Sequence, residues 1–126
     1  MVRCAIYTRT NVGNDINHEE LHLRQRQAVS AYIAEREVHG WTCVGTYQDV
    51  GYSAGHLTRP ALKQMLADIA SGQIDCVVIE SLDRLSRSMT NLHQLASGFQ
   101  HYGVTLVTVA SGPIDILQWG FLYAGD

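Results

Sequence analysis

Residues Cys76-Val77-Val78-Ile79, followed after Glu80 by Ser81-Leu82-Asp83-Arg84-Leu85-Ser86-Arg87-Ser88, decide how this chain folds. The first four residues are apolar without interruption, which predicts a strand buried on both faces of a parallel sheet. The polar residues then begin where this strand ends, and the carboxyl ends of parallel strands are the usual location of a site in an open α/β sheet. Two guanidinium groups and a carboxylate at such an edge indicate a site that handles phosphate.

Strands and helices alternate along the rest of the chain. The apolar patterns predict strands at Arg3–Thr8, Thr42–Gln48, Cys76–Ile79 and Val104–Val109. They predict helices over Glu19–Val38 before Gly40, from Pro60 to the stop at Ser71-Gly72, and around Leu92, Leu95, Ala96 and Phe99. This alternation predicts a three-layer α/β fold, with an open, mainly parallel sheet of four to five strands and helices on both faces.

The composition favours one compact domain and gives little evidence about partners. The chain has 126 residues, of which 46% are hydrophobic, so it can form one core and is too short for two ordinary domains. A net charge of -3 and a pI near 6.0 give no support for nucleic-acid binding, which would have to rest on local arginines. The sequence shows no signal peptide and no stretch that would cross a bilayer, so we expect a cytoplasmic protein.

The cysteines indicate a reducing compartment. Cys4, Cys43 and Cys76 each lie in an apolar, strand-like segment, without Cys-x-x-Cys or Cys/His ligand spacing. We therefore expect all three to be small core residues. The histidines are scattered as well, and the sequence predicts no metal site.

Polar residues at the strand ends define a candidate site. Alternate side chains of an extended segment share a face, so Tyr7, Arg9 and Asn11 project together while Thr8 and Thr10 face the other way. Parallel strands would gather several polar residues around one crevice: Arg9, Asp49, Ser53, Asp83, Arg84 and Arg87. Arginines there would clamp a phosphodiester and stabilise the charge that builds on its oxygens, which lysines would do less well.

Each candidate residue also has a purely structural interpretation. Asp83, Arg84 and Arg87 are equally consistent with an ion-pair network that caps a helix. The other positions suit turn, surface or exposed helix roles: Asp49 and Ser53 in a Gly-rich turn, Arg59 before Pro60, and Gln25 on a helix. The order and spacing of the motifs are what favour a functional interpretation.

Five segments, in order, resemble the serine recombinase family of resolvases, invertases and serine integrases. They are Ala5-Ile6-Tyr7-Thr8-Arg9, Gln25-Arg26, Tyr47-Gln48-Asp49-Val50-Gly51-Tyr52-Ser53-Ala54-Gly55, Arg59-Pro60-Ala61-Leu62 and Leu82-Asp83-Arg84-Leu85-Ser86-Arg87. Pro113-Ile114-Asp115 is also similar, so the resemblance runs from about Val2 to Asp115. It implies a catalytic domain that cuts and rejoins DNA through a phosphoserine link, with an arginine-rich pocket and no metal or nucleotide cofactor.

The resemblance also implies roles for individual residues. Arg9, Arg84 and Arg87 would hold the scissile phosphate, and Asp83 would orient these arginines or assist proton transfer. The pocket or the DNA backbone would be supported by Gln25, Asp49, Ser53 and Arg59.

The nucleophile position departs from the family pattern. The family motif places a serine two residues after the first arginine, whereas this chain has Asn11, whose amide cannot form a phosphoester by the same route. Thr10 carries a hydroxyl one residue away, but strand alternation points it to the opposite face. We therefore expect strand cleavage to be impaired or absent.

The C-terminal segment departs as well. Family members continue from residues matching 113–115 into a long helix with dimer contacts and then a DNA-binding domain. We expect residues 1–115 to form the catalytic domain and residues 116–126, with Trp119, Phe121 and Tyr123, to be a divergent, truncated tail without a DNA-binding domain. A homodimer or tetramer would require the missing helix.

Three functional hypotheses follow. The first is the catalytic domain of a site-specific recombinase of a mobile element, which binds a DNA phosphate but has little cleavage activity of its own. The second is a non-catalytic regulatory partner of a full-length recombinase. The third sets the family aside and predicts a flavodoxin-like or receiver-like module that binds a phosphorylated small molecule or accepts phosphate on Asp49 or Asp83.

Overall fold

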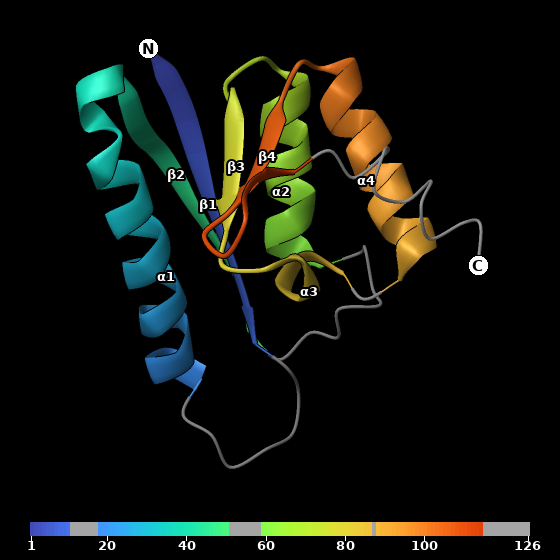
Figure 1. Ribbon diagram of the computed structural model, residues 1–126. Coiled ribbons are helices and arrows are strands. Elements are labelled where there is room, and N and C mark those ends of the chain that lie inside the picture. Colours follow the sequence, from blue (N-terminus) through green and yellow to red (C-terminus); the bar gives the residue numbers. More distant parts are fainter. Residues whose placement is uncertain (11–17, 51–58, 87, 115–126) are drawn as a thin grey trace.

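The computed structural model describes residues 1–10, 18–50, 59–86 and 88–114, whose strands form one five-stranded sheet (Figure 1). The strands are β1 (Val2–Thr10), β2 (Trp41–Val50), β3 (Cys76–Ile79), β4 (Thr105–Thr108) and β5 (Gly112–Ile114). Their order across the sheet is β2-β1-β3-β4-β5. The first four strands are mutually parallel and β5 runs antiparallel to β4, which confirms the predicted open, mainly parallel sheet.

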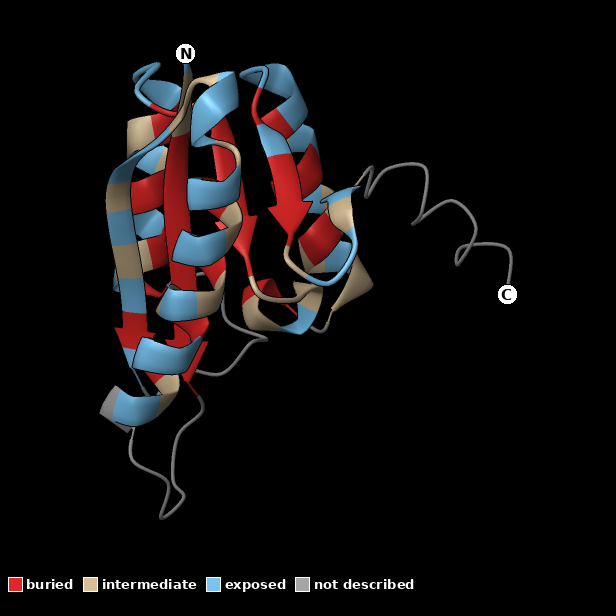
Figure 2. Ribbon diagram, turned by 60° about the vertical axis from the view of Figure 1, so that its left-hand side comes forward, coloured by how far each residue is buried: buried red, intermediate tan, exposed pale blue. Residues whose placement is uncertain are grey.

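Helices cover both faces of this sheet and make it the middle of three layers (Figures 1 and 2). The helices are α1 (His18–Glu35), the short 3-10 helix η1 (Glu37–His39), α2 (Pro60–Ala70), α3 (Leu82–Leu85) and α4 (Met89–His101). The larger apolar core lies between the sheet and α2 and α4, and the smaller one lies between the sheet and α1. Strands β1 and β3 contribute to both cores, because successive side chains point to opposite faces. None of the described helices is long and apolar enough to span a membrane.

The first helix ends earlier than the sequence pattern predicted. Helix α1 stops at Glu35 rather than Val38, and Gly40 closes the following 3-10 turn with a φ of 87° and an N–H bonded to the Glu37 carbonyl. The reason is that the buried face of α1 ends at Ile33, whereas Val38 is 83% exposed and gains nothing from another helical turn.

The second strand lies at the edge of the sheet, and its burial differs from the prediction. Cys4 and Cys76 are buried as expected, but Cys43 on β2 is exposed, so its assignment to the core was wrong. The position of β2 explains this, because the side chains of β1 and β3 pack beneath α1 while most of β2 stays open to solvent. An apolar sequence pattern does not distinguish an edge strand from a central one.

One ion pair connects the amino-terminal part of β1 with the residue before β3. The Asp75 carboxylate accepts hydrogen bonds from the Arg3 backbone N–H at 2.9 Å and from Nε and Nη2 of Arg3, both at 3.0 Å. These bonds lower the pKa of the Asp75 carboxyl to about 2. The pair therefore favours the ionised carboxylate in the folded chain.

Replacing Asp75 with Asn should remove a pH-dependent part of the stability. A carboxyl whose pKa falls on folding contributes stability above its unfolded value, here 3.8, and loses that contribution as the pH drops towards 2. We expect the difference in free energy of unfolding between wild type and Asp75→Asn, measured with urea, to be largest above about pH 4 and to shrink towards zero near pH 2. The exposed pair of Glu20 with Arg24 supplies a control, since Glu20→Gln should change little at any pH. If the difference in unfolding free energy between wild type and Asp75→Asn stayed constant across this pH range, the bonds from Arg3 would not be the cause of a lowered Asp75 pKa.

Candidate active site

Strand β1 ends in three fully buried polar residues, Thr8, Arg9 and Thr10. Its pairing with β3 stops at Ile6, whereas its pairing with β2 continues to Thr10. The end of β1 therefore extends past its neighbour on one side. The strand order also changes direction between β1 and β3, and such a switch point is where open α/β sheets commonly bind ligands.

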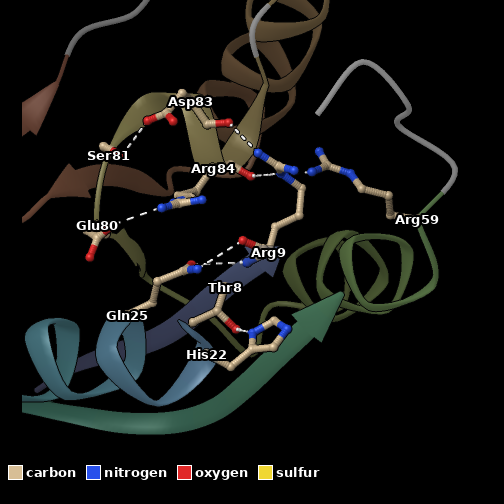
Figure 3. A network of polar contacts seen from close by, with 9 residues as sticks. All are labelled: Thr8, Arg9, His22, Gln25, Arg59, Glu80, Ser81, Asp83 and Arg84. Atoms are coloured by element: carbon tan, nitrogen blue, oxygen red, sulfur yellow. Dashed lines mark hydrogen bonds and ion pairs between the residues drawn. The ribbon is translucent and has the colours of Figure 1, made fainter. Parts of the chain in front are cut away.

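Two buried arginines converge on the short helix α3 (Figure 3). Arg9 donates from Nε to the Arg84 carbonyl and from Nη2 to the Asp83 carbonyl, both at 3.0 Å. Arg59, the residue before α2, donates from Nη1 to the same Arg84 carbonyl at 3.3 Å and from Nη2 to the Leu85 carbonyl. The last carbonyls of a helix lack partners within it, so they attract such donors. Arg59 is fully buried, and its interpretation as a surface residue was wrong.

The guanidinium groups at this edge retain hydrogen-bonding capacity. Burial lowers the pKa of Arg59, an effect that Tyr7 and Asp49 partly offset. Within the described part of the chain, Nε of Arg59 and Nε of Arg84 are buried without a hydrogen-bond partner, although Nε of Arg84 lies 3.5 Å from a Glu80 carboxylate oxygen. Oxygen atoms of a phosphate are suitable acceptors for donors of this kind.

Helix α1 fixes the backbone of Arg9 from the other side of the sheet. The Gln25 amide accepts from the Arg9 N–H at 3.1 Å and donates to the Arg9 carbonyl at 2.9 Å, as a neighbouring strand would (Figure 3). Gln25 is buried, so its interpretation as an exposed helix position was wrong. With both backbone and guanidinium held, Arg9 occupies a defined position.

A residue that the sequence interpretation missed, His22, binds the threonines on either side of Arg9. Nδ1 of its ring lies 2.8 Å from Oγ1 of Thr8, and Nε2 lies 3.3 Å from Oγ1 of Thr10. Both threonines thus face α1, opposite to the guanidinium of Arg9, which confirms the predicted alternation. The available signal was helical spacing. His22 and Gln25 lie on the same buried face of α1 as Val29 and Ile33, nearer to the carboxyl end of β1.

Asp49 supports the site indirectly, through the start of α2. Its carboxylate accepts from the N–H groups of Ala61 and Leu62 at 2.9 and 3.1 Å, and from the Tyr7 hydroxyl at 2.7 Å. It thereby stabilises the first turn of the helix that directly follows Arg59. Burial is the main cause that raises the pKa of Tyr7, so Tyr7 remains the hydroxyl donor in this contact.

Of the remaining predicted site residues, the structure describes Asp83 and does not describe three others. Asp83 is exposed, its carboxylate accepts a hydrogen bond from the Ser81 hydroxyl, and its backbone carbonyl holds Arg9. Asn11, Ser53 and Arg87 lie outside the described residues. The structure thus brings together Arg9, Gln25, Arg59 and the backbone of α3.

Comparisons with known proteins point to one family. The family model for the resolvase N-terminal domain matches residues 4–118. The N-terminal catalytic domain of TP901-1 integrase is 26% identical with a TM-score of 0.79, and the alignment covers 98% of this chain and 92% of that one. A resolvase family site-specific recombinase from Streptococcus pneumoniae is 23% identical with a TM-score of 0.74, over 99% of this chain and 87% of that one. The C-terminal catalytic domain of ISC1926 TnpA, an IS607-like serine recombinase, is 22% identical with a TM-score of 0.72, over 98% and 79%. No curated protein sequence matches the chain.

Removing the Asp49 carboxylate should destabilise the domain more than removing a similar group nearer the surface. Asp49→Ala leaves two N–H groups and a buried hydroxyl without their acceptor, which should cost about 2–3 kcal/mol of unfolding free energy. Asp68 is the matched control, because it also accepts from a tyrosine hydroxyl, that of Tyr47 at 2.5 Å, but is only half-buried. We expect Asp68→Ala to cost under about 1 kcal/mol in the same urea titration. Equal losses would show that Asp49 does not anchor α2.

Proposed function

Because the chain belongs to the resolvase family of serine recombinases, we propose that the carboxyl edge of its sheet binds a phosphate of the DNA backbone. The observation that carries this proposal is the convergence of Arg9 and Arg59 on α3, next to Arg84. Their positions are set by backbone carbonyls rather than by long-range charge, so the charged groups are held in place before a ligand arrives. Such preorganisation is what stabilises negative charge at a phosphoryl centre.

The arginines have distinct proposed roles. Arg84, which is partly exposed, would contact the phosphate oxygens together with Arg87. Arg9 has no exposed surface in this structure, so it would add its positive charge from beneath, and Arg59 would fix the end of α3 from the side of α2. Gln25 would keep Arg9 in register, and Asp49 would act through α2. We propose that Asp83 acts mainly by presenting its backbone carbonyl to Arg9.

We propose that this chain binds DNA without cleaving it. In a phosphoserine mechanism the serine oxygen forms a bond to phosphorus while the bond from phosphorus to one DNA oxygen breaks, and Asn11 supplies no hydroxyl for that step. The hydroxyl next to Asn11 in the sequence belongs to Thr10, which is fully buried and bonded to His22 on the α1 side. The Thr10 hydroxyl would reach a phosphate near Arg9 only if the carboxyl end of β1 rearranged.

A regulatory role beside an active recombinase is a second candidate. It is favoured by a contrast within the chain. The arginine cluster, formed by Arg9, Arg59 and Arg84, is retained, whereas Asn11 stands where the family motif has a serine. A phosphate-accepting receiver module is disfavoured for Asp49, because that carboxylate is buried and already accepts three hydrogen bonds.

Replacing Arg84 with Gln should weaken binding to DNA. Arg84→Gln removes one guanidinium from the proposed phosphate site, so the dissociation constant for a short duplex, followed by fluorescence anisotropy at low salt, should rise about three- to tenfold. The slope of the logarithm of the binding constant against the logarithm of the salt concentration should also become shallower, by the equivalent of about one phosphate contact. Arg24 is a matched control because it too pairs with a glutamate four residues away, on the exposed face of α1. If Arg84→Gln and Arg24→Gln raised the dissociation constant equally, the DNA would bind at another part of the chain.

Restoring a serine at position 11 should restore covalent attachment to DNA. The full chain fused to a DNA-binding domain would be incubated with DNA carrying that domain's sites, and protein–DNA adducts would be separated on denaturing gels. We expect no adduct for wild type, an adduct for Asn11→Ser, and the same adduct when Thr10→Val is added, because the Thr10 hydroxyl faces α1. An adduct of wild type that disappears with Thr10→Val would identify Thr10 as the nucleophile. Absence of an adduct from Asn11→Ser would favour the regulatory role.

A further inference from the structure

The three cysteines of the chain lie in one row across three adjacent strands. Cys4 on β1 is in register with Cys43 on β2 and also with Cys76 on β3. Residues separated by dozens of positions in sequence are thus direct neighbours in the sheet. The row crosses the sheet away from the arginine cluster, which lies at the carboxyl end of β1.

The row points to the α1 side of the sheet. Cys4 and Cys76 belong to the smaller core together with Val29 and Ile33 of α1. Cys43 lines a hollow of about 170 Å³ between α1 and β2, whose lining also includes Ile33 and Trp41. Trp41, two residues before Cys43 on β2, packs against the same core as Cys4, and Cys43 is in register with Cys4, so the two cysteine side chains lie on the same side of the sheet.

Exposure changes sharply along the row. Cys43 is exposed, whereas Cys4 is 0% and Cys76 is 2% exposed. Burial raises the pKa of Cys4, and it raises the pKa of Cys76 to about 12. The buried thiols therefore stay protonated and react slowly with solutes, so a reagent from solvent meets Cys43 first.

We propose that Cys43 and Cys4 form an oxidation site, in which a small peroxide oxidises Cys43 and Cys4 then closes a disulfide between β2 and β1. Paired residues on neighbouring strands are separated by one strand spacing, about 4.7–4.9 Å, which lies within the range of about 4.4–6.8 Å for Cα atoms of disulfides. The hollow next to Cys43 is several times the volume of about 30 Å³ that a water molecule occupies in the liquid, so it admits hydrogen peroxide.

The chemistry balances in two steps. In the first, the Cys43 sulfur attacks one peroxide oxygen, the O–O bond breaks, and Cys43 becomes a sulfenic acid while one water molecule leaves. In the second, the Cys4 sulfur attacks the Cys43 sulfur, the S–O bond breaks, and the hydroxyl leaves as water with the proton of Cys4. Two thiols and one hydrogen peroxide thus give one disulfide and two water molecules.

Cys76 is the other neighbour of Cys4 in the row, because it is in register with Cys4 on β3. The row does not suit a shared metal ion, because Cys43 and Cys76 are two strand spacings apart, roughly 9–10 Å, whereas Zn–S bonds are about 2.3 Å.

The test uses the full chain, reduced and then treated with equimolar hydrogen peroxide. Remaining thiols are blocked with N-ethylmaleimide, and the protein is digested without reductant for mass spectrometry. We expect a peptide pair linked through Cys4 and Cys43, reversed by dithiothreitol, in wild type and in Cys76→Ser. Cys4→Ala should stop at the Cys43 sulfenic acid, which dimedone traps. Cys43→Ser should slow the loss of the first thiol by about tenfold or more, since only buried thiols remain.

Specific outcomes would overturn the proposal. A disulfide of Cys4 with Cys76 that forms equally fast in Cys43→Ser would show that the exposed thiol is not the entry point. Links between two copies of the chain through Cys43 alone, with Cys4 still alkylated, would show that the row does not act within one molecule. Cys43→Ser carries the test even if Cys4→Ala fails to fold, because Cys43 is exposed and belongs to neither of the two apolar cores of the described residues.

Discussion

The burial of Arg9 is the constraint on which the rest of the site depends. A guanidinium with no exposed surface is costly unless its charge and its N–H groups are met by oxygen atoms. Here α3 supplies the carbonyls and Gln25 of α1 supplies the partners of the Arg9 backbone. The short helix after β3, the position of α1 and the end of β1 are therefore tied to one side chain, and Arg59 joins the arrangement through the same Arg84 carbonyl.

The fold was largely predictable because its signals are local. The apolar run at Cys76–Ile79 and the alternation of strands and helices decided the sheet, and the two-residue period of β1 correctly separated Arg9 from Thr10. Burial of polar side chains was less predictable. Nothing in the local sequence around Gln25 or Arg59 shows that a carbonyl will be available, because their partners lie 16 and 25 or more residues away in the chain. The exposure of Cys43 depends on β2 being an edge strand, which only the strand order reveals.

The strand order is shared by proteins with other chemistries, so the sheet alone does not identify the function. The order β2-β1-β3-β4-β5 also occurs in flavodoxin-like proteins, which bind their ligands at the same switch point. The particular residues at that point distinguish the cases. Here the edge carries arginines held by carbonyls, and the aspartate after the second strand is used to hold a helix. This combination suits the recognition of a phosphodiester better than the acceptance of a phosphoryl group.

The contacts that hold Arg9 have a consequence for how such a domain changes during evolution. Arg9 is held by Gln25 of α1 and by the carbonyls of Asp83 and Arg84 in α3, so its contacts join elements of the fold as well as the site. Selection for stability alone would therefore preserve the arginine cluster in a lineage that has lost its nucleophile. Mutations at position 9 would be removed because they weaken the fold as well as the site. An intact arginine cluster in a descendant is thus evidence of its stability and does not by itself show that the ancestral chemistry persists.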